Sequence, residues 1–232
     1  MPFKRHLDES FPRVWDRWET DGNTWTIEDL PPGDEDEAID IMLKHLCPDE
    51  PLYILNKLLD DPESVQEMCK TWRLCFKQRI SLACYVESGS ERTLVALNVC
   101  TVKMKGDRTN TEVRGENYKN AQQTRLYLES KLDILEHLNV DKALIAMGLV
   151  VRKEYRGARL GSRLLAAREP LCRYLGIKAT VSTFTSIIAQ KVAVRSGFTT
   201  ILEVSIKELS EAGLKYPKED NRIIKIMMKK YE

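Results

Sequence analysis

The sequence lacks the features that mark membrane, secreted and nucleic-acid-binding proteins. No apolar run is long enough to span a bilayer, and the N-terminal stretch MPFKRHLDES has no apolar leader segment. The 36 basic and 35 acidic residues leave a formal net charge of +1, so no overall field draws the chain to nucleic acid or to an anionic lipid surface. We therefore expect a cytoplasmic protein that binds neither nucleic acid nor membrane.

The cysteines lack a pattern that would indicate a metal or a disulfide framework. None belongs to a CxxC pair, and their scattered spacing predicts reduced thiols and no bound metal. The six are Cys47, Cys69, Cys75, Cys84, Cys100 and Cys172. We expect Cys47 and Cys172 to be core residues, which disfavours a mechanism through an acetyl-cysteine.

What the sequence does contain is an alternation of helical and β-like segments over 232 residues. Residues 1–24 show no clean period and are expected to form an irregular arm, and residues 105–120 a loop. Because no linker divides the rest, we predict one α/β domain over residues 25–232. Apolar spacing predicts helices over residues 34–47, 63–77, 122–138, 161–175 and 186–196, and strands over residues 25–30, 79–86, 93–104, 142–151, 178–184, 199–206 and 222–228.

The junction VVRKEYRGARLGSRLL, after the strand at 142–151, is the most informative stretch. The amides in the first turn of a helix have no partner within the helix, and small residues let a ligand approach that backbone. A phosphate or pyrophosphate suits such a site, and Arg156 and Arg159 add charged donors. A plain surface turn with solvated arginines is the alternative. Gly148, within the preceding strand, indicates a bulge or a close approach of ligand.

Two blocks of this region resemble signatures of the GNAT superfamily of N-acetyltransferases. The first is the acyl-CoA signature Arg/Gln-x-x-Gly-x-Gly/Ala, with Arg156 first, Gly161 last and Arg159 in place of the middle glycine. The second is SIIAQKVAVRSGF, which ends in Gly197 and Phe198. The resemblance implies the GNAT fold: a central mixed, mostly antiparallel sheet, flanked by helices and splayed between two parallel strands.

The resemblance also implies acetyl-CoA as co-substrate. It places the thioester oxygen near an amide of Leu149 or Val150, which would stabilise the developing oxyanion, and the pyrophosphate over the loop. Ser186 has a second explanation, because N-capping is the commonest role of a serine before a helix. The implied cofactor-binding residues are Leu149, Val150, Val151, Arg156, Gly157, Ala158, Arg159, Leu160, Gly161, Ser162, Ser186 and Lys191.

The N-terminal half narrows the acceptor. The stretch TIEDLPPGDEDEAIDIMLKHLCPDEPLYIL resembles the insect arylalkylamine N-acetyltransferase-like group, whose general base would fall on Glu50. An alkylammonium must lose a proton before it attacks a thioester, and a nearby carboxylate can bind the cation and accept that proton. Nine acidic residues lie between Glu28 and Glu50 against one lysine, which suits a cationic acceptor. For Asp34 to Glu37, a solvated helix N-terminus, where acidic residues are favoured, is the preferred explanation.

The leaving thiolate needs a proton or a hydrogen bond, and here the sequence departs from the family. Ala193 occupies the position of the tyrosine that many GNAT enzymes use. The insect group tends to place two hydroxyls four residues apart, at positions that are Thr185 and Ala189 here. Thr185 is therefore the second catalytic candidate. Neighbouring hydroxyls that would substitute belong to Ser182, Thr183 and Ser186.

We interpret the chain as an acetyl-CoA-dependent N-acetyltransferase, acting as a monomer or weak dimer. It would acetylate the primary amine of a small arylalkylamine or polyamine-like acceptor by direct attack in a ternary complex. Tyr53, Tyr216 and the N-terminal tryptophans would line an arylalkyl pocket or pack in the core. Two alternatives stay open: a protein N-terminal or lysine acetyltransferase of the same fold, and a non-catalytic acyl-CoA-binding or regulatory protein. The physiological amine, the acyl-chain preference and the group that protonates the thiolate are left undecided.

Overall fold

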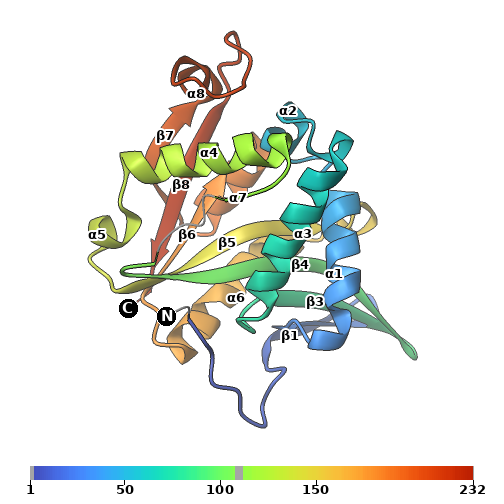
Figure 1. Ribbon diagram of the computed structural model, residues 1–232. Coiled ribbons are helices and arrows are strands. Elements are labelled where there is room, and N and C mark those ends of the chain that lie inside the picture. The colour runs from blue at the N-terminus through green and yellow to red at the C-terminus, as the bar shows by residue number, and fades with distance from the viewer. Residues whose placement is uncertain (1–2, 108–111, 232) are drawn as a thin grey trace.

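A computed structural model describes residues 3–107 and 112–231. Eight strands form one continuous sheet in the order β1-β2-β3-β4-β5-β6-β8-β7 (Figure 1). The pair β5–β6 is parallel, and the other neighbouring pairs are antiparallel. The strands are β1 Val14–Thr20, β2 Asn23–Asp29, β3 Leu82–Ser88, β4 Glu91–Met104, β5 Lys142–Val151, β6 Ala179–Phe184, β7 Thr199–Ser205 and β8 Ile223–Lys230.

Helices cover both faces of this sheet. Helices α1, α3 and α4 lie over one face, and α6 packs on the other (Figure 1). Both faces are therefore buried, which is why strands β3 to β5 consist largely of apolar residues. The helices are α1 Glu35–Ile41, α2 Pro51–Leu55, α3 Pro62–Phe76, α4 Glu116–Lys131, α5 Ile134–Leu138, α6 Leu160–Tyr174, α7 Ile187–Arg195 and α8 Ile206–Glu211.

The predicted splay between two parallel strands is confirmed. Strands β5 and β6 pair only where Leu144 faces Thr180 and Ile145 faces Val181. Beyond that point β6 pairs with β8 and β5 with β4, so the facing edges of β5 and β6 separate toward their C-terminal ends. The molecule has the GNAT fold expected from the two sequence blocks, and the splay opens where the loop 152–159 begins.

The expectation that residues 1–24 are irregular is wrong for residues 14–20. This segment forms β1, which pairs with β2 at the edge of the sheet. The register shifts between Val14 and Asp16, so Trp15 and Trp18 both pack on the core although they are three residues apart. A bulge of this kind destroys the period of two that identifies a strand in the sequence.

Two other boundaries differ from the sequence prediction. Helix α4 begins at Glu116, inside the expected loop, while residues 108–111 of that loop lie outside the described residues. The helix expected over 122–138 is divided into α4 and α5, because Asp133 caps the second helix through the amides of Leu135 and Glu136. The short helices α2 and α8 were not predicted.

Among residues 3–107 and 112–231, no helix has the length and apolar character needed to cross a membrane. The same residues contain no group of three or more His, Cys, Asp or Glu side chains arranged to hold a metal ion. All six cysteines are free.

Candidate active site

The loop between β5 and α6 presents unpaired backbone donors. Helix α6 begins at Leu160, and its N-cap residue Arg159 makes no side-chain capping bond. The first amide at this end with a helical partner is that of Arg163, which donates to the Arg159 carbonyl at 3.1 Å. Over the described chain, no carbonyl or side chain accepts from the amides of residues 157–162. These groups fit the phosphate of a nucleotide cofactor, which would supply the acceptors they lack.

Arg159, at the position of a glycine in the family signature, has a backbone conformation that glycine adopts most readily. Its φ is +58°, in the left-handed region, and Gly157 has a φ of +91°. The loop therefore follows the path that a glycine would allow, despite the arginine. The side chain of Arg159 is exposed, and its role as a further cation for the cofactor phosphates stays a prediction.

Arg156 lies against the N-terminal half of the chain rather than over the loop. Its Nη1 forms an ion pair with Asp49 Oδ2 at 2.8 Å, and its Nη2 donates to the His45 carbonyl at 3.1 Å. Nε donates to the Val151 carbonyl at 3.2 Å. A bound phosphate would therefore compete with Asp49 for this arginine. Asp49 directly precedes Glu50, so the residue that the cofactor loop contacts adjoins the candidate base in the sequence.

The bulge expected at Gly148 is confirmed on β5. Val99 faces Gly148 and Cys100 faces Ala146, so Met147 has no partner on β4. The Trp72 indole donates to the Met147 carbonyl at 3.2 Å, and Asn98 Nδ2 donates to the Gly148 carbonyl at 2.8 Å. These two side chains satisfy carbonyls that the bulge removes from the ladder. Leu149, Val150 and Val151 follow, paired with β4 on one edge and facing the splay with the other.

The two catalytic candidates are in direct contact. Thr185 Oγ1 donates to Glu50 Oε2 at 2.9 Å, although the residues are 135 positions apart. Thr185 directly follows β6, and Glu50 is the N-cap of α2, where Oε1 accepts the Leu52 amide at 3.3 Å. Pro51, at the first helical position, fixes the bend between Glu50 and α2. The hydrogen bond thus joins the end of β6 to the N-terminus of α2.

The environment of Glu50 favours a base that titrates near neutrality. Burial raises the pKa of Glu50 to about 7, against the lowering effects of the Thr185 hydrogen bond, the Leu52 amide and the positive charge of Arg222. Desolvation disfavours the charged carboxylate more than these contacts stabilise it. A base with this pKa is half ionised close to physiological pH, which is the range in which proton transfer is most efficient.

A buried polar network holds α2 and hence Glu50. Asn56, at the end of α2, donates to the Leu52 carbonyl at 2.7 Å and to the Tyr216 hydroxyl at 3.0 Å. Asn120 on α4 donates to Asn56 Oδ1 at 2.6 Å, and Thr124 contacts the Tyr216 hydroxyl at 2.6 Å. The network ties α2 to α4 and to the segment that follows α8. Tyr216 is therefore a structural residue rather than part of an exposed aromatic pocket.

Most of the acidic residues that suggested a cationic acceptor form ion pairs or hydrogen bonds with other side chains of the chain. Asp34 accepts from the Tyr85 hydroxyl, and Asp49 pairs with Arg156. Of the nine carboxylates from Glu28 to Glu50, Glu50 is the one for which the described residues offer neither a cation in contact nor a tyrosine. The other ion pairs are Glu28–Arg92, Asp29–Arg5, Glu35–Arg79, Asp36–Arg73, Glu37–Arg152 and Asp40–Lys44.

The thiols are unsuited to nucleophilic chemistry. Cys47 and Cys172 are buried, as expected, with exposed fractions of 2% and 0%. Burial raises the pKa of Cys47 to about 12 and shifts that of Cys172 in the same direction. Neither thiol ionises near neutral pH.

The second sequence block forms α7 beside the splay. Ser186 caps this helix by accepting the Ala189 amide at 3.2 Å, so its hydroxyl has the capping role that was its alternative explanation. Lys191 is exposed on the same helix. Both stay predictions as cofactor ligands. The N-terminal tryptophans are used elsewhere: Trp18 stacks on Trp25 with ring centroids 5.8 Å apart.

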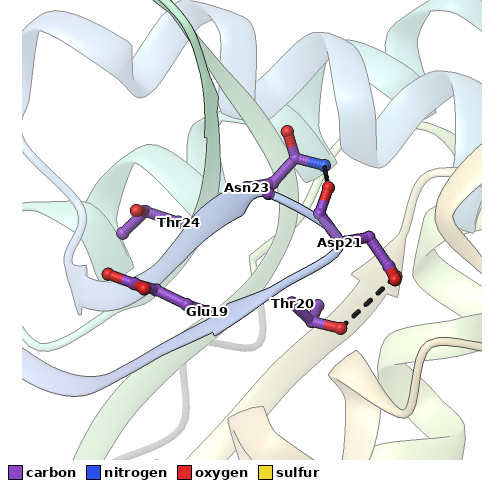
Figure 2. A pocket seen from close by; sticks show the side chains of 6 residues that line it. Glu19, Thr20, Asp21, Asn23 and Thr24 are labelled. Atoms are coloured by element: carbon purple, nitrogen blue, oxygen red, sulfur yellow. Dashed lines mark hydrogen bonds between the residues drawn. The ribbon is translucent and has the colours of Figure 1, made fainter.

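A cavity of about 580 Å³ lies between the sheet and helices α3 and α4; residues of β5 and β6 contribute to its wall, whereas Glu50 and Thr185 do not. Its walls are mainly apolar, and they include residues 145–147 of β5 and residues 181–183 of β6. The apolar and thioether side chains are Leu74, Val102, Leu128, Ile134, Ile145, Ala146, Met147, Val181 and Ile226. Figure 2 shows another hollow, at the β1–β2 turn, which residues 19–24 of a single hairpin line; it contains no predicted site residue.

One charged residue at the splay was missed. Arg168 on α6 is 1% exposed and binds side chains of both β4 and β6. The signal was present in the sequence: Arg168 lies three and four residues after Leu165 and Leu164, within the apolar stripe of its helix. A cation at such a position is seldom buried without a specific partner.

Comparisons with known proteins agree with this geometry. No protein-family model matches the chain. No curated protein matches it either. Among solved structures, a candidate arylalkylamine N-acetyltransferase 7 from the yellow fever mosquito Aedes aegypti has 28% identity and a TM-score of 0.91, and the match covers 99% of this chain and 100% of that chain. Arylalkylamine N-acetyltransferase 2 from the same mosquito has 19% identity and a TM-score of 0.76, with 90% and 99% covered. A polyamine N-acetyltransferase from Drosophila melanogaster has 16% identity and a TM-score of 0.72, with 89% and 99% covered.

The splayed parallel pair, the bulged strand and the loop of free amides define the fold of the GNAT acetyltransferases. Within that class, the structural resemblance is to insect arylalkylamine N-acetyltransferases, and with the mosquito candidate it extends over nearly the whole chain.

Proposed function

We propose that this chain is an acetyl-CoA-dependent amine N-acetyltransferase. The observation that carries the proposal is the hydrogen bond from Thr185 to Glu50, because it places a carboxylate with a near-neutral pKa at the open end of the splay. The loop of unpaired amides lies at the same end of β5. A carboxylate that deprotonates an amine and a cradle for an acyl-CoA are the two parts that this reaction needs.

The residues of the loop fit the cofactor. The amides of residues 157–162 would bind the pyrophosphate, with Arg156 and Arg159 as charged donors, and the free edge of Leu149 to Val151 would hold the pantetheine arm. Acetyl-CoA, when bound, supplies the activated acyl group. The roles of Ser186 and Lys191 in this binding are part of the proposal.

Glu50 binds the acceptor ammonium and accepts its proton. The Thr185 hydroxyl orients Oε2 and stabilises the ionised form, while the N-cap bond from Leu52 fixes Oε1. The free amine then attacks directly, because the buried thiols of the chain stay protonated and offer no route through an acetyl-cysteine.

For the acceptor, the cavity favours an amine with an apolar body over a polyamine. Its walls are mainly apolar, and the acidic residues between Glu28 and Asp49 are held by internal partners. Glu129, a carboxylate in the cavity wall, already contacts Lys103 at 3.3 Å and Arg125 at 3.5 Å. A second ammonium of a polyamine would meet these cations, whereas an aromatic ring would bury apolar surface.

The test is an assay of CoA release by the purified protein with acetyl-CoA and a panel of amines. We expect turnover with tyramine, dopamine, serotonin or tryptamine at a kcat/KM at least tenfold higher than with agmatine or spermidine. The panel also includes a short peptide with a free N-terminus and a lysine. Turnover on the peptide alone would support a protein acetyltransferase. Tight CoA binding without turnover on any amine would overturn the proposal in favour of a binding protein.

A further inference from the structure

Arg222 is the charged side chain that acts on the candidate base. Burial raises the pKa of Glu50, and the positive charge of Arg222 opposes this effect. The other titratable groups in the field of Glu50 belong to Cys47, Tyr53 and Tyr216. Burial raises the pKa of all three, so they are neutral near pH 7. Among the described residues, the charge balance at this corner therefore depends on where the guanidinium of Arg222 is held.

Arg222 lies on the side of the sheet where α2 packs. It directly precedes β8, and Ile224 of that strand belongs to the same apolar cluster as Leu52 of α2. Because side chains alternate along a strand, Arg222 faces the same side as Ile224. Thr185 is level with Ile224, since the ladder between β6 and β8 ends one residue before Thr185. Arg222 therefore leaves the sheet beside the corner where Thr185 contacts Glu50.

Asp220 holds this guanidinium in a fixed position. Arg222 Nε lies 3.0 Å from each oxygen of the Asp220 carboxylate, and Nη2 donates to Oδ2. The Arg222 amide also donates to Oδ1, at 3.0 Å. The Asp220 side chain is 13% exposed, against 47% for that of Arg222, so the carboxylate is the more enclosed partner. Several bonds to one carboxylate fix the orientation of a guanidinium, which a single bond would not.

The segment that carries Asp220 is anchored on both sides. Tyr216, four residues earlier, accepts a hydrogen bond from Asn56 at the end of α2, at 3.0 Å. After Asp220, the Arg222 carbonyl accepts the amide of Ile206 at 2.9 Å. The network that holds the helix of the candidate base thus also holds the segment that restrains the arginine.

A contact between Arg222 and Glu50 would disable the base. Over the described chain the two residues form no ion pair, and Arg222 is paired with Asp220 instead. A direct ion pair would occupy the carboxylate that an acceptor ammonium needs, and a cation in contact lowers the pKa of an acid by about 1–3 units. With the charges of Asp220 and Arg222 cancelling, ionised Glu50 leaves one net negative charge at the corner, which suits an ammonium.

We propose that Asp220 is a positioning residue, which holds Arg222 beside Glu50 but out of contact, so that the Glu50 carboxylate stays free to bind the acceptor ammonium. This inference rests on the proposed acetyltransferase function. The proton of the amine goes to Glu50, and Arg222 keeps its charge throughout, because a guanidinium does not lose its proton in proteins. Asp220 acts through Arg222 alone.

The first experiment titrates Glu50 in the whole protein, by NMR of the side-chain carboxyl carbons of labelled glutamate, with Glu50→Gln identifying the signal. Asp220→Asn should lower the pKa of Glu50 by about one unit or more, because the freed guanidinium contacts it. Arg222→Gln should raise this pKa by less than about one unit, since it removes the field alone. The double variant should titrate like Arg222→Gln, because Asp220 then has nothing to hold. A loop that merely loosened would not produce this order.

The second experiment measures steady-state kinetics with tyramine at saturating acetyl-CoA. Asp220→Asn should raise KM for the amine by about tenfold, and the double variant should return it to within about threefold of the parent. Glu203→Gln is the matched control, because it breaks the Glu203–Lys225 ion pair of 2.6 Å between β7 and β8 without touching Asp220. This variant should change neither the titration of Glu50 nor KM.

If Asp220→Asn does not fold, Arg222→Lys takes its place. A lysine keeps the charge but cannot bind Asp220 through a planar fork, so it should lower the pKa of Glu50 in the same direction. A Glu50 that titrates in Asp220→Asn as in the parent, or a double variant with the KM of Asp220→Asn, overturns this inference and leaves the role of Glu50 as a base intact. Absence of turnover with every amine, together with the expected titrations, would instead overturn the proposed function.

Discussion

The cofactor loop and the corner at Glu50 are built in opposite ways. The loop over residues 157–162 is exposed at residues 157–159, offers backbone amides without partners in the described chain, and takes its shape from positive φ angles at Gly157 and Arg159. The corner is half-buried and its polar groups are satisfied: Glu50 accepts from Thr185 and from its own helix, and a network around Asn56 holds that helix in place. The loop offers its donors to a ligand, whereas the corner is preorganised without one.

This contrast separates binding from chemistry. A phosphate brings its own charge and needs only donors, so a local turn is sufficient. A general base needs a tuned pKa, which only a particular set of neighbours provides. We therefore expect substitutions in the corner to change rates and pH profiles, and substitutions in the loop to change affinities.

The largest effect should come from Glu50→Gln. Glutamine keeps the shape and the N-cap but cannot accept a proton, so kcat/KM should fall by about 10²- to 10⁴-fold with little change in CoA affinity. Steady-state kinetics and calorimetry measure the two quantities. Asp49→Asn is the control, because this neighbouring carboxylate contacts Arg156 rather than Thr185, and its kcat should change less than tenfold. Equal losses of kcat in the two variants would contradict the assignment of Glu50.

The bulge at Gly148 precedes the loop in the sequence and lies against the segment that leads to Glu50. Gly148→Ala tests whether this close approach requires a glycine. Gly148 has a φ of +150°, and a Cβ there would lie 2.5 Å from Met42 Cε and 3.1 Å from Leu46 Cδ2. We expect a loss of about 1–3 kcal/mol in the free energy of unfolding, measured by urea denaturation. Gly33→Ala is the matched control, because a Cβ at that position would meet nothing within 4 Å, and it should be neutral. A neutral Gly148→Ala would show that the methionine side chain moves aside without cost.

The same contrast explains what the sequence could predict. The loop was recognisable because its residues are contiguous: strand β5 has the predicted bounds Lys142–Val151, and α6 begins one residue before the predicted start. Glu50 and Thr185 were each identified by resemblance, but their hydrogen bond joins residues 135 positions apart and has no local signal. The sequence does not predict strand β1, because a bulge interrupts its alternation. It does not predict the contacts of Arg168 either, because the residues that bind this side chain come from β4 and β6. A regular segment with an uninterrupted period follows from local sequence, whereas a bulged strand and long-range side-chain contacts do not.

Arg156→Ala should show a smaller effect, and on affinity alone. A charge-assisted bond to phosphate contributes about 1.5–3 kcal/mol, but breaking the exposed ion pair with Asp49 costs up to about 1 kcal/mol of it. The affinity for CoA should therefore fall by about 2- to 30-fold by calorimetry, with kcat unchanged at saturation. Lys153 also contacts Asp49, and Lys153→Ala should lower the affinity for CoA less than Arg156→Ala does. Pantetheine lacks the pyrophosphate, so its affinity should not respond; a matching loss there would place Arg156 away from the phosphates.

The smallest expected effect is a shift in the pH dependence of kcat/KM, and it tests the contact between Thr185 and Glu50 most specifically. If Glu50 is the base, kcat/KM of the parent should rise with pH and level off above about 7, because the carboxyl must be ionised to accept a proton. The Thr185 hydrogen bond favours the ionised form, so Thr185→Val should raise the pKa of Glu50 and move this limb to higher pH, by less than about one unit. Ser196→Ala, which removes a hydroxyl from the end of α7, should leave it in place. A limb that moves to lower pH would mean that Thr185 accepts a hydrogen bond from a protonated Glu50, and the carboxyl would then serve as an acid rather than a base.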